Sequence, residues 1–90
     1  MTALTGVDSI EPEIVAALRE VGASVVHLWQ ASKAGAPDLI VAWSGQVHLL
    51  EVKSPTGRLS KEQREFHAMW KAPIHIVRSV DEALRAIGAL

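Results

Sequence analysis

Two apolar runs, DLIVAW (38–43) and QVHLLEVK (46–53), are separated by the dipeptide Ser44-Gly45. Both runs are rich in β-branched and aromatic residues, which is typical of strands, and a two-residue loop with glycine is typical of a tight hairpin. Such a loop pairs Trp43 with Gln46, and counting outward along the two strands places Asp38 directly opposite Glu51. The sequence therefore predicts a β-hairpin over residues 38–53 whose open end carries two facing carboxylates.

Lys53 follows Glu51 by two residues, so strand alternation puts both side chains on the same face of the hairpin. Like charges that face each other destabilise a strand pair unless a cation lies between them. Carboxylate oxygens with room for water are the ligands that Mg²⁺ prefers, and the backbone carbonyl of Val52 could add another oxygen. A structural ion pair between Glu51 and Lys53 is the alternative, but it needs only one of the two acids.

The remaining chain alternates between helical and strand-like patterns. Apolar spacing predicts a helix over residues 11–22, a strand over 23–29 and a loop over 30–37. The patterns Ser60 to Gln63 and Ser79 to Glu82 resemble capping boxes, which open helices over about 61–71 and through Ala89, with a strand over 73–78 between them. The order α-β-β-β-α-β-α predicts an α/β (α+β) fold with a mixed sheet flanked by helices.

Ninety residues make one small domain, and residues 1–8 are expected to form a loose arm. Because 49% of the residues are hydrophobic, a generous fraction for so short a chain, we expect a second subunit to cover part of the surface. The chain has no cysteine, no signal-peptide pattern at its start and no apolar run of the ~20 residues that span a bilayer, so we expect a cytoplasmic protein without a membrane partner.

Other residues are candidates for a site on weaker grounds. Gln63 lies in the stripe Leu59, Gln63, Phe66, Trp70, the expected buried face of its helix, and it could serve as a cap, as a site residue or as both. Glu11 stands in the first turn of the first helix, where the helix dipole alone favours an acid.

Four of the nine basic residues lie in the segment 53–64, which includes Arg58, Lys61 and Arg64. These three are candidates for DNA contact, although a solvated surface explains them equally. Lys33, in the loop before the hairpin, could also reach a phosphate of DNA, but a solvated loop lysine is the better account of it. The tryptophans at 29, 43 and 70 are expected in the core or an interface, and no pair of histidines has the spacing of metal ligands.

Three motifs together resemble the VRR-NUC (virus-type replication-repair nuclease) family of the PD-(D/E)XK nuclease superfamily. They are Gly35-Ala36-Pro37-Asp38, Glu51-Val52-Lys53 and the segment GRLSKEQ at 57–63, and the ending IHIVRSVDEALRAI is also similar. The resemblance covers about residues 9–88, is fairly specific once the L-S-x-x-Q segment is included, and is closest to the stand-alone phage or bacterial type.

The resemblance implies a restriction-endonuclease-like αβββαβ core and a Mg²⁺- or Mn²⁺-dependent endodeoxyribonuclease. By carry-over, Asp38 and Glu51 would hold the metal with the Val52 carbonyl, Lys53 would be catalytic and Gln63 would support the site. Similarity to archaeal Holliday-junction resolvases would add Glu11 as a further metal ligand.

The family also implies a homodimer that acts on branched DNA, in a bacterial cell or a phage-infected host, and leaves a 5′-phosphate. Resolution of Holliday junctions is the first expectation. Cleavage of flaps, forks or plain duplex by the same chemistry, or a non-catalytic DNA-binding or dimerisation module of the same fold, are the alternatives.

Overall fold

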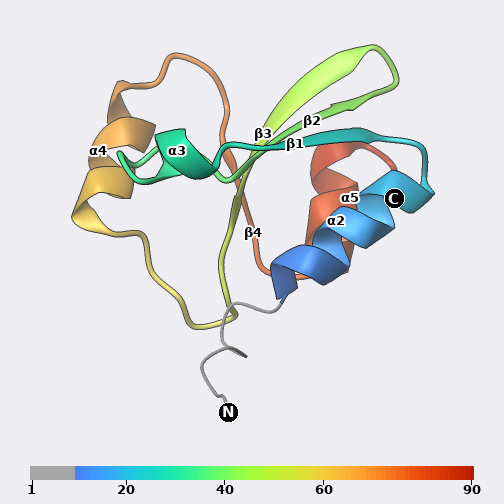
Figure 1. Ribbon diagram of the computed structural model, residues 1–90, viewed down its shortest axis with the longest axis horizontal. Coiled ribbons are helices and arrows are strands. Elements are labelled where there is room, and N and C mark those ends of the chain that lie inside the picture. The colour runs from blue at the N-terminus through green and yellow to red at the C-terminus, as the bar shows by residue number, and fades with distance from the viewer. Residues whose placement is uncertain (1–9) are drawn as a thin grey trace.

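The structure, a computed structural model, describes residues 10–90; the arm expected over residues 1–8 lies outside the described residues. The elements are α2 (Ile10–Glu20), β1 (Ser24–His27), α3 (Trp29–Ser32), β2 (Leu39–Trp43), β3 (Gln46–Val52), α4 (Lys61–Met69), β4 (His75–Val77) and α5 (Val80–Ile87). Figure 1 shows α2 and α5 together on one side of the strands and α3 and α4 on the other. The predicted order is confirmed, with the short helix α3 as an addition.

The four strands form one mixed sheet in the order β1-β2-β3-β4. β1, β2 and β3 are antiparallel neighbours, whereas β4 runs parallel to β3 after the crossover through α4. The hairpin register pairs Trp43 with Gln46 and Leu39 with Leu50, as the two-residue loop predicts. Ser44 and Gly45 both have positive φ in that loop, the conformation that a type I′ turn requires.

The hydrophobic core lies between one face of the sheet and the helices α2 and α5. Its fully buried side chains include Ile14 and Leu18 from α2 and Leu39, Val41 and Leu50 from the hairpin. Residues at alternate positions of a strand share a face, so Leu39 and Val41 point toward these helices while their neighbours point away. At roughly 25 cal/mol per Å² of buried apolar surface, this cluster supplies the main stabilisation of the domain.

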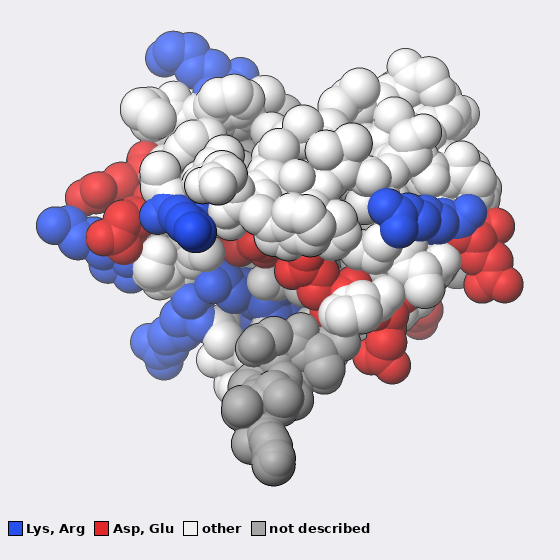
Figure 2. Space-filling view, in the orientation of Figure 1, with Lys and Arg blue, Asp and Glu red and all other residues white. Residues whose placement is uncertain are grey.

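The second face of the sheet carries apolar side chains that no described helix covers fully. Helix α4 has no buried residue, and the strand residues Val26 and Val47 on this face are 56% and 69% exposed. Met69 at the end of α4 is 64% exposed as well. Figure 2 shows the resulting surface around the hairpin as largely free of charged side chains. The expected buried stripe on α4 is wrong in part, because Trp70 is 43% exposed.

The strand predicted over residues 23–29 ends at His27, and the predicted loop 30–37 contains α3 instead. The register of β1 and β2 explains why β1 ends at His27. The amide of Leu28 still donates to the carbonyl of Asp38 (2.8 Å), but the next residue, Trp29, would face Pro37. Proline has no N–H to continue a ladder, so the chain leaves the sheet and turns into α3.

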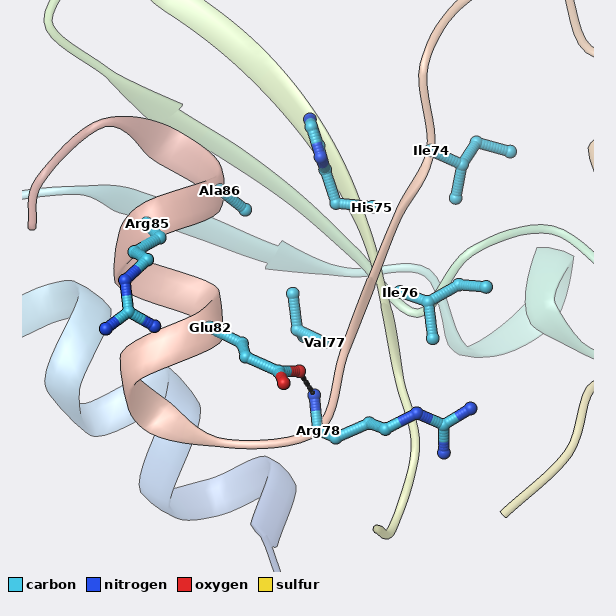
Figure 3. Close-up of a pocket in the computed structure, with 8 residues that line it drawn as sticks. All are labelled: Ile74, His75, Ile76, Val77, Arg78, Glu82, Arg85 and Ala86. Atoms are coloured by element: carbon cyan, nitrogen blue, oxygen red, sulfur yellow. Dashed lines mark hydrogen bonds between the residues drawn. The ribbon is translucent and has the colours of Figure 1, made fainter. Parts of the chain in front are cut away.

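The two predicted capping boxes differ in the structure. Ser60 and Gln63 form a complete box, with each side chain bound to the other's backbone amide. The Ser79 hydroxyl accepts from the amide of Glu82, but the Glu82 carboxylate accepts from the amide of Arg78 rather than that of Ser79. Figure 3 shows this bond. An open groove of about 730 Å³ between β4 and α5 lies beside it. The second box is therefore only half formed.

Candidate active site

Asp38 and Glu51 meet at the open end of the hairpin. The register that pairs Leu39 with Leu50 places the two acids opposite each other one residue further on. The Oδ2 atom of Asp38 accepts a hydrogen bond from the backbone amide of Val52 (2.8 Å), which fixes the aspartate side chain against β3. The predicted convergence of the two carboxyl groups is thus present in the fold.

Glu51 is the one charged residue within residues 10–90 that is buried, with only 1% of its surface exposed. Its Oε2 atom accepts from Nε2 of Gln63 (3.2 Å), while its Oε1 atom has no hydrogen-bond partner in this part of the chain. An unpaired buried carboxylate oxygen is costly, so this atom marks a place where another group belongs.

The environment keeps Glu51 protonated near neutral pH when no cation is bound. Burial, then the hydrogen bond to Asp38 and the negative charge of Asp38, raise the pKa of Glu51 from 4.5 to about 8. The charge of Glu11 raises the same pKa further, and the ammonium of Lys53 lowers it. A buried acid whose pKa is raised beside a second carboxyl group is typical of sites in which a cation or a reaction takes up the charge.

Lys53 lies at the same end of the sheet, just after β3. Its backbone amide donates to the carbonyl of Val77 in β4 (3.0 Å). A Cβ built on Gly57 would lie 3.6 Å from Cδ of Lys53, so the lysine stem runs beside this glycine. Because the ammonium changes the pKa of both Glu51 and His67, it lies within electrostatic reach of both.

The turn between Lys53 and α4 is held by Arg78, which the sequence did not indicate. Its Nη1 atom donates to the carbonyls of Ser54 (2.6 Å) and Gly57 (2.7 Å). Figure 3 shows the arginine side chain extending away from α5, on the other side of β4 from Glu82. Arg78 therefore ties the end of β4 to the turn that joins Lys53 to α4.

Gln63 forms the cap of α4 and also contacts the acidic pair. Its Oε1 atom accepts from the amide of Ser60 (2.8 Å) as part of the cap, and its Nε2 atom donates to Glu51. The side chain spans the start of α4 and the acidic pair, so the cap fixes the amide that holds the carboxylate.

His67 is a site residue that the sequence pattern did not single out. Its Nε2 atom lies 3.8 Å from Oε1 of Glu51, and this buried nitrogen has no hydrogen-bond partner within the described chain. Burial and then the charge of Lys53 lower the pKa of His67, which favours the neutral imidazole. Its position four residues after Gln63 is the available signal, because residues i and i+4 share a helix face.

Glu11 lies in the first turn of α2. Its Oε2 atom is 3.2 Å from Nδ1 of His27, and its charge acts on Glu51. The structure therefore brings Glu11 within electrostatic reach of the acidic pair, although its described contact is with a histidine.

The four residues predicted to contact DNA are all exposed: Lys33, Arg58, Lys61 and Arg64. Lys61 forms a loose surface pair with Glu65 (4.0 Å), and Arg64 donates to the carbonyl of Leu59 (3.0 Å). Figure 2 shows basic side chains on the α4 side of the molecule with acidic ones between them, so this face carries a mixed surface rather than a continuous positive one.

The donor set fits a hard divalent cation. Two carboxyl groups are in contact, one of their oxygens is unpaired, and the buried position makes their combined negative charge costly without a cation. Within residues 10–90 no three His, Cys, Asp or Glu side chains are arranged as a metal-binding group. Two carboxylates completed by a carbonyl and waters form a set that Mg²⁺ accepts, unlike the closed sites of structural zinc.

No helix within the described part of the chain is long and apolar enough to cross a bilayer.

Comparison with known proteins identifies the family. A solved structure described as a VRR_NUC domain superposes with a TM-score of 0.69, at 23% sequence identity, over 87% of this chain and 89% of that one. This likeness shows a shared fold. A search of the curated proteins finds no match. The sequence model of the VRR-NUC domain matches residues 3–72, which include the hairpin, the acidic pair and α4. This chain therefore belongs to the VRR-NUC domain family and has the fold of a nuclease.

Proposed function

We propose that this protein is a Mg²⁺- or Mn²⁺-dependent endonuclease that hydrolyses phosphodiester bonds in branched DNA, with four-way Holliday junctions as the first candidate substrate. The contact between Asp38 and Glu51, with Lys53 at the same end of the sheet, is the observation that carries the proposal. The family supports a nuclease in general, and the acidic pair supplies the chemical reason for a metal.

Each residue of the site has a distinct task in this mechanism. Asp38 and Glu51 would hold the metal ion together with the carbonyl of Val52, and Glu11 is a further candidate ligand. The bound ion supplies Lewis-acid polarisation of the scissile phosphate. Gln63 keeps the Glu51 carboxylate oriented through its hydrogen bond to Oε2. Lys53 orients the attacking water and balances the charge that develops on the phosphate.

A homodimer is the second part of the proposal, and the uncovered sheet face supports it. Val26 and Val47 lie on the face of the sheet opposite the core and are more than half exposed. A second copy that covered this face would remove apolar surface from water and bring two acidic pairs onto one branched substrate.

The cleavage test compares wild type with Asp38→Asn and Lys53→Ala on a labelled four-way junction with Mg²⁺. The asparagine retains an oxygen for the Val52 amide, so it removes charge while keeping the local hydrogen bond. We expect each variant to lose at least about a hundredfold in rate, with folding and dimerisation unchanged. Arg85→Ala, an exposed residue of α5, is the matched control. Equal rates for all four proteins would remove the enzymatic assignment.

The substrate is tested by a panel of junction, flap, splayed arm, duplex and single strand at one salt concentration, because salt alone changes apparent preference. Calorimetric titration with Mn²⁺ distinguishes a nuclease from the non-catalytic alternative. A DNA-binding module without catalysis would show junction binding but neither cleavage nor a metal site that Asp38→Asn removes.

A further inference from the structure

The large aromatic side chain of Trp29 is exposed, and this exposure does not stabilise the fold. The sequence predicted a core or interface role for it, but 68% of its surface is exposed, more than that of any other tryptophan in the chain. An indole ring left in water gives up most of the free energy that its burial would contribute. Exposed aromatic rings that are held in position are typical of binding surfaces.

The indole is held by a stack rather than left loose. The ring centroids of Trp29 and His27 are 4.5 Å apart with an angle of 10° between their planes. His27 is in turn 3.2 Å from the carboxylate of Glu11 in α2, and the hydroxyl of Ser32 donates to the carbonyl of Trp29 (3.0 Å). The stack on His27 of β1, which Glu11 of α2 holds in turn, orients the ring and keeps the conformational cost of a further stacking partner low.

The platform lies at the same end of the sheet as Asp38. Leu28 pairs with Asp38 across β1 and β2, and Trp29 is the next residue. One Cα step beyond a strand pair puts the Trp29 backbone within about 9 Å of that of Asp38. A nucleotide next to a phosphate held at Asp38 would therefore lie within reach of the indole.

An open cavity of about 530 Å³ lies against the stacked pair. Pro12, Val15 and Ala16 of α2 provide an apolar wall, and His27 and Trp29 provide an aromatic one. The lining also contains the guanidinium of Arg19, which donates to the carbonyl of Val25 (3.3 Å), and the carboxylate of Glu11, which contacts His27. A flat apolar ring beside a cationic group matches the shape and charge of a nucleotide, whose base stacks and whose phosphate pairs with arginine.

We infer that Trp29 and the adjoining cavity bind a nucleobase of the DNA substrate that is unstacked on one face, next to the scissile phosphate. In an intact duplex both faces of each base are covered by its neighbours, so only a base at a junction, flap or fork offers a face to the indole. The inference rests on the proposed DNA nuclease function and gives it a physical basis for selecting branched over duplex DNA.

The test measures binding without cleavage, with Ca²⁺ in place of Mg²⁺. Fluorescence anisotropy gives the Kd of a flap and of a duplex of the same sequence for wild type, Trp29→Ala and Trp29→Phe. Trp29→Ala should weaken flap binding roughly 5- to 150-fold, the range for loss of one base–aromatic stack, and change duplex binding less than about twofold. Trp29→Phe retains a ring and should keep most of the affinity. Trp70→Ala, which removes another partly exposed stacked tryptophan, is the matched control.

A second readout follows the base itself. 2-Aminopurine at the unpaired position next to the cleavage point should be quenched by wild type and by Trp29→Phe, but not by Trp29→Ala. Equal losses on flap and duplex, no loss on either, or the same loss with Trp70→Ala would overturn the inference. Failure of the proposed function is a different result: wild type that binds the flap through Trp29 but cleaves no DNA in Mg²⁺ leaves the stacking site in place.

Discussion

The Nε2 atom of His67 lies 3.8 Å from the Oε1 atom of Glu51, and neither atom has a hydrogen-bond partner within residues 10–90. The other oxygen of the same carboxylate accepts from Gln63, one turn earlier on α4. Helix α4 therefore directs an amide and an imidazole at the two oxygens of one buried acid, which makes it a support for the geometry of Glu51.

His67→Ala should weaken the binding of Mn²⁺ by about tenfold, because groups that orient a metal ligand are worth about 10- to 100-fold in affinity. His67→Gln retains an N–H group at a similar distance and should recover most of the loss. Isothermal titration calorimetry measures both, and His75→Ala in β4 is the control. Unchanged Mn²⁺ affinity in His67→Ala would show that the imidazole is only a packing residue.

The raised pKa of Glu51 predicts how stability depends on pH in metal-free protein. The folded protein keeps the Glu51 proton up to pH about 8, whereas the unfolded chain releases it near 4.5. The stabilisation linked to this proton is complete below pH 4.5 and is lost as pH rises through 8, at a slope of up to about 1.4 kcal/mol per pH unit.

Urea denaturation in EDTA between about pH 5 and pH 9 measures this loss. Glu51→Gln keeps an oxygen for Gln63 but cannot ionise, so the difference in unfolding free energy between wild type and variant isolates the titration of the acid. The unfolding free energy of wild type should fall relative to that of the variant as pH rises. A difference that stays constant with pH would contradict the assignment of the shift to Glu51.

Gly35, in the motif before Asp38, is required for the close approach of the chain to α4. Its φ is +99°, and a Cβ at this position would collide with the backbone carbonyl of Glu62. Gly35→Ala should destabilise the domain by about 2–4 kcal/mol, from strain and overpacking together, and should also lower cleavage by displacing Gln63.

Gly45→Ala is the matched control for this change, because Gly45 also has positive φ (+77°) but a Cβ there meets nothing within 4 Å. It should cost only the backbone strain, about 1–2 kcal/mol. Thermal denaturation of both variants gives the comparison. Equal destabilisation of the two variants would show that the close contact of Gly35 with α4 adds nothing to the cost of the substitution.

The uncovered sheet face predicts the effect of a charge on self-association. Val47→Glu should shift a dimer toward monomer at micromolar concentration, because an interface would have to bury the new carboxylate. Val21→Glu, at an exposed valine that follows α2, should leave the mass unchanged. Light scattering after gel filtration measures both. A wild-type protein that is monomeric at these concentrations would contradict the homodimer.

Local chemistry determined the parts of this protein that the sequence predicted. A two-residue loop leaves one register for its strands, and this alone set Asp38 opposite Glu51. A serine hydroxyl three residues before an amide sufficed to start α4 at Lys61. The family motifs coincide with these features, so the position of the acidic pair follows from the order of the residues alone.

Only the tertiary structure decided which side chains are buried and what they meet. Pro37, just before the neighbouring strand β2, determines where β1 ends. The exposure of Trp29 follows from this end of the strand. The contact of His67 with Glu51 depends on how α4 packs against the sheet. The hydrogen bond from the amide of Arg78 to Glu82 depends on the path of the chain into α5. Loops and caps are governed by neighbours along the chain, whereas burial and pKa are governed by neighbours in space, which spacing along one sequence does not specify.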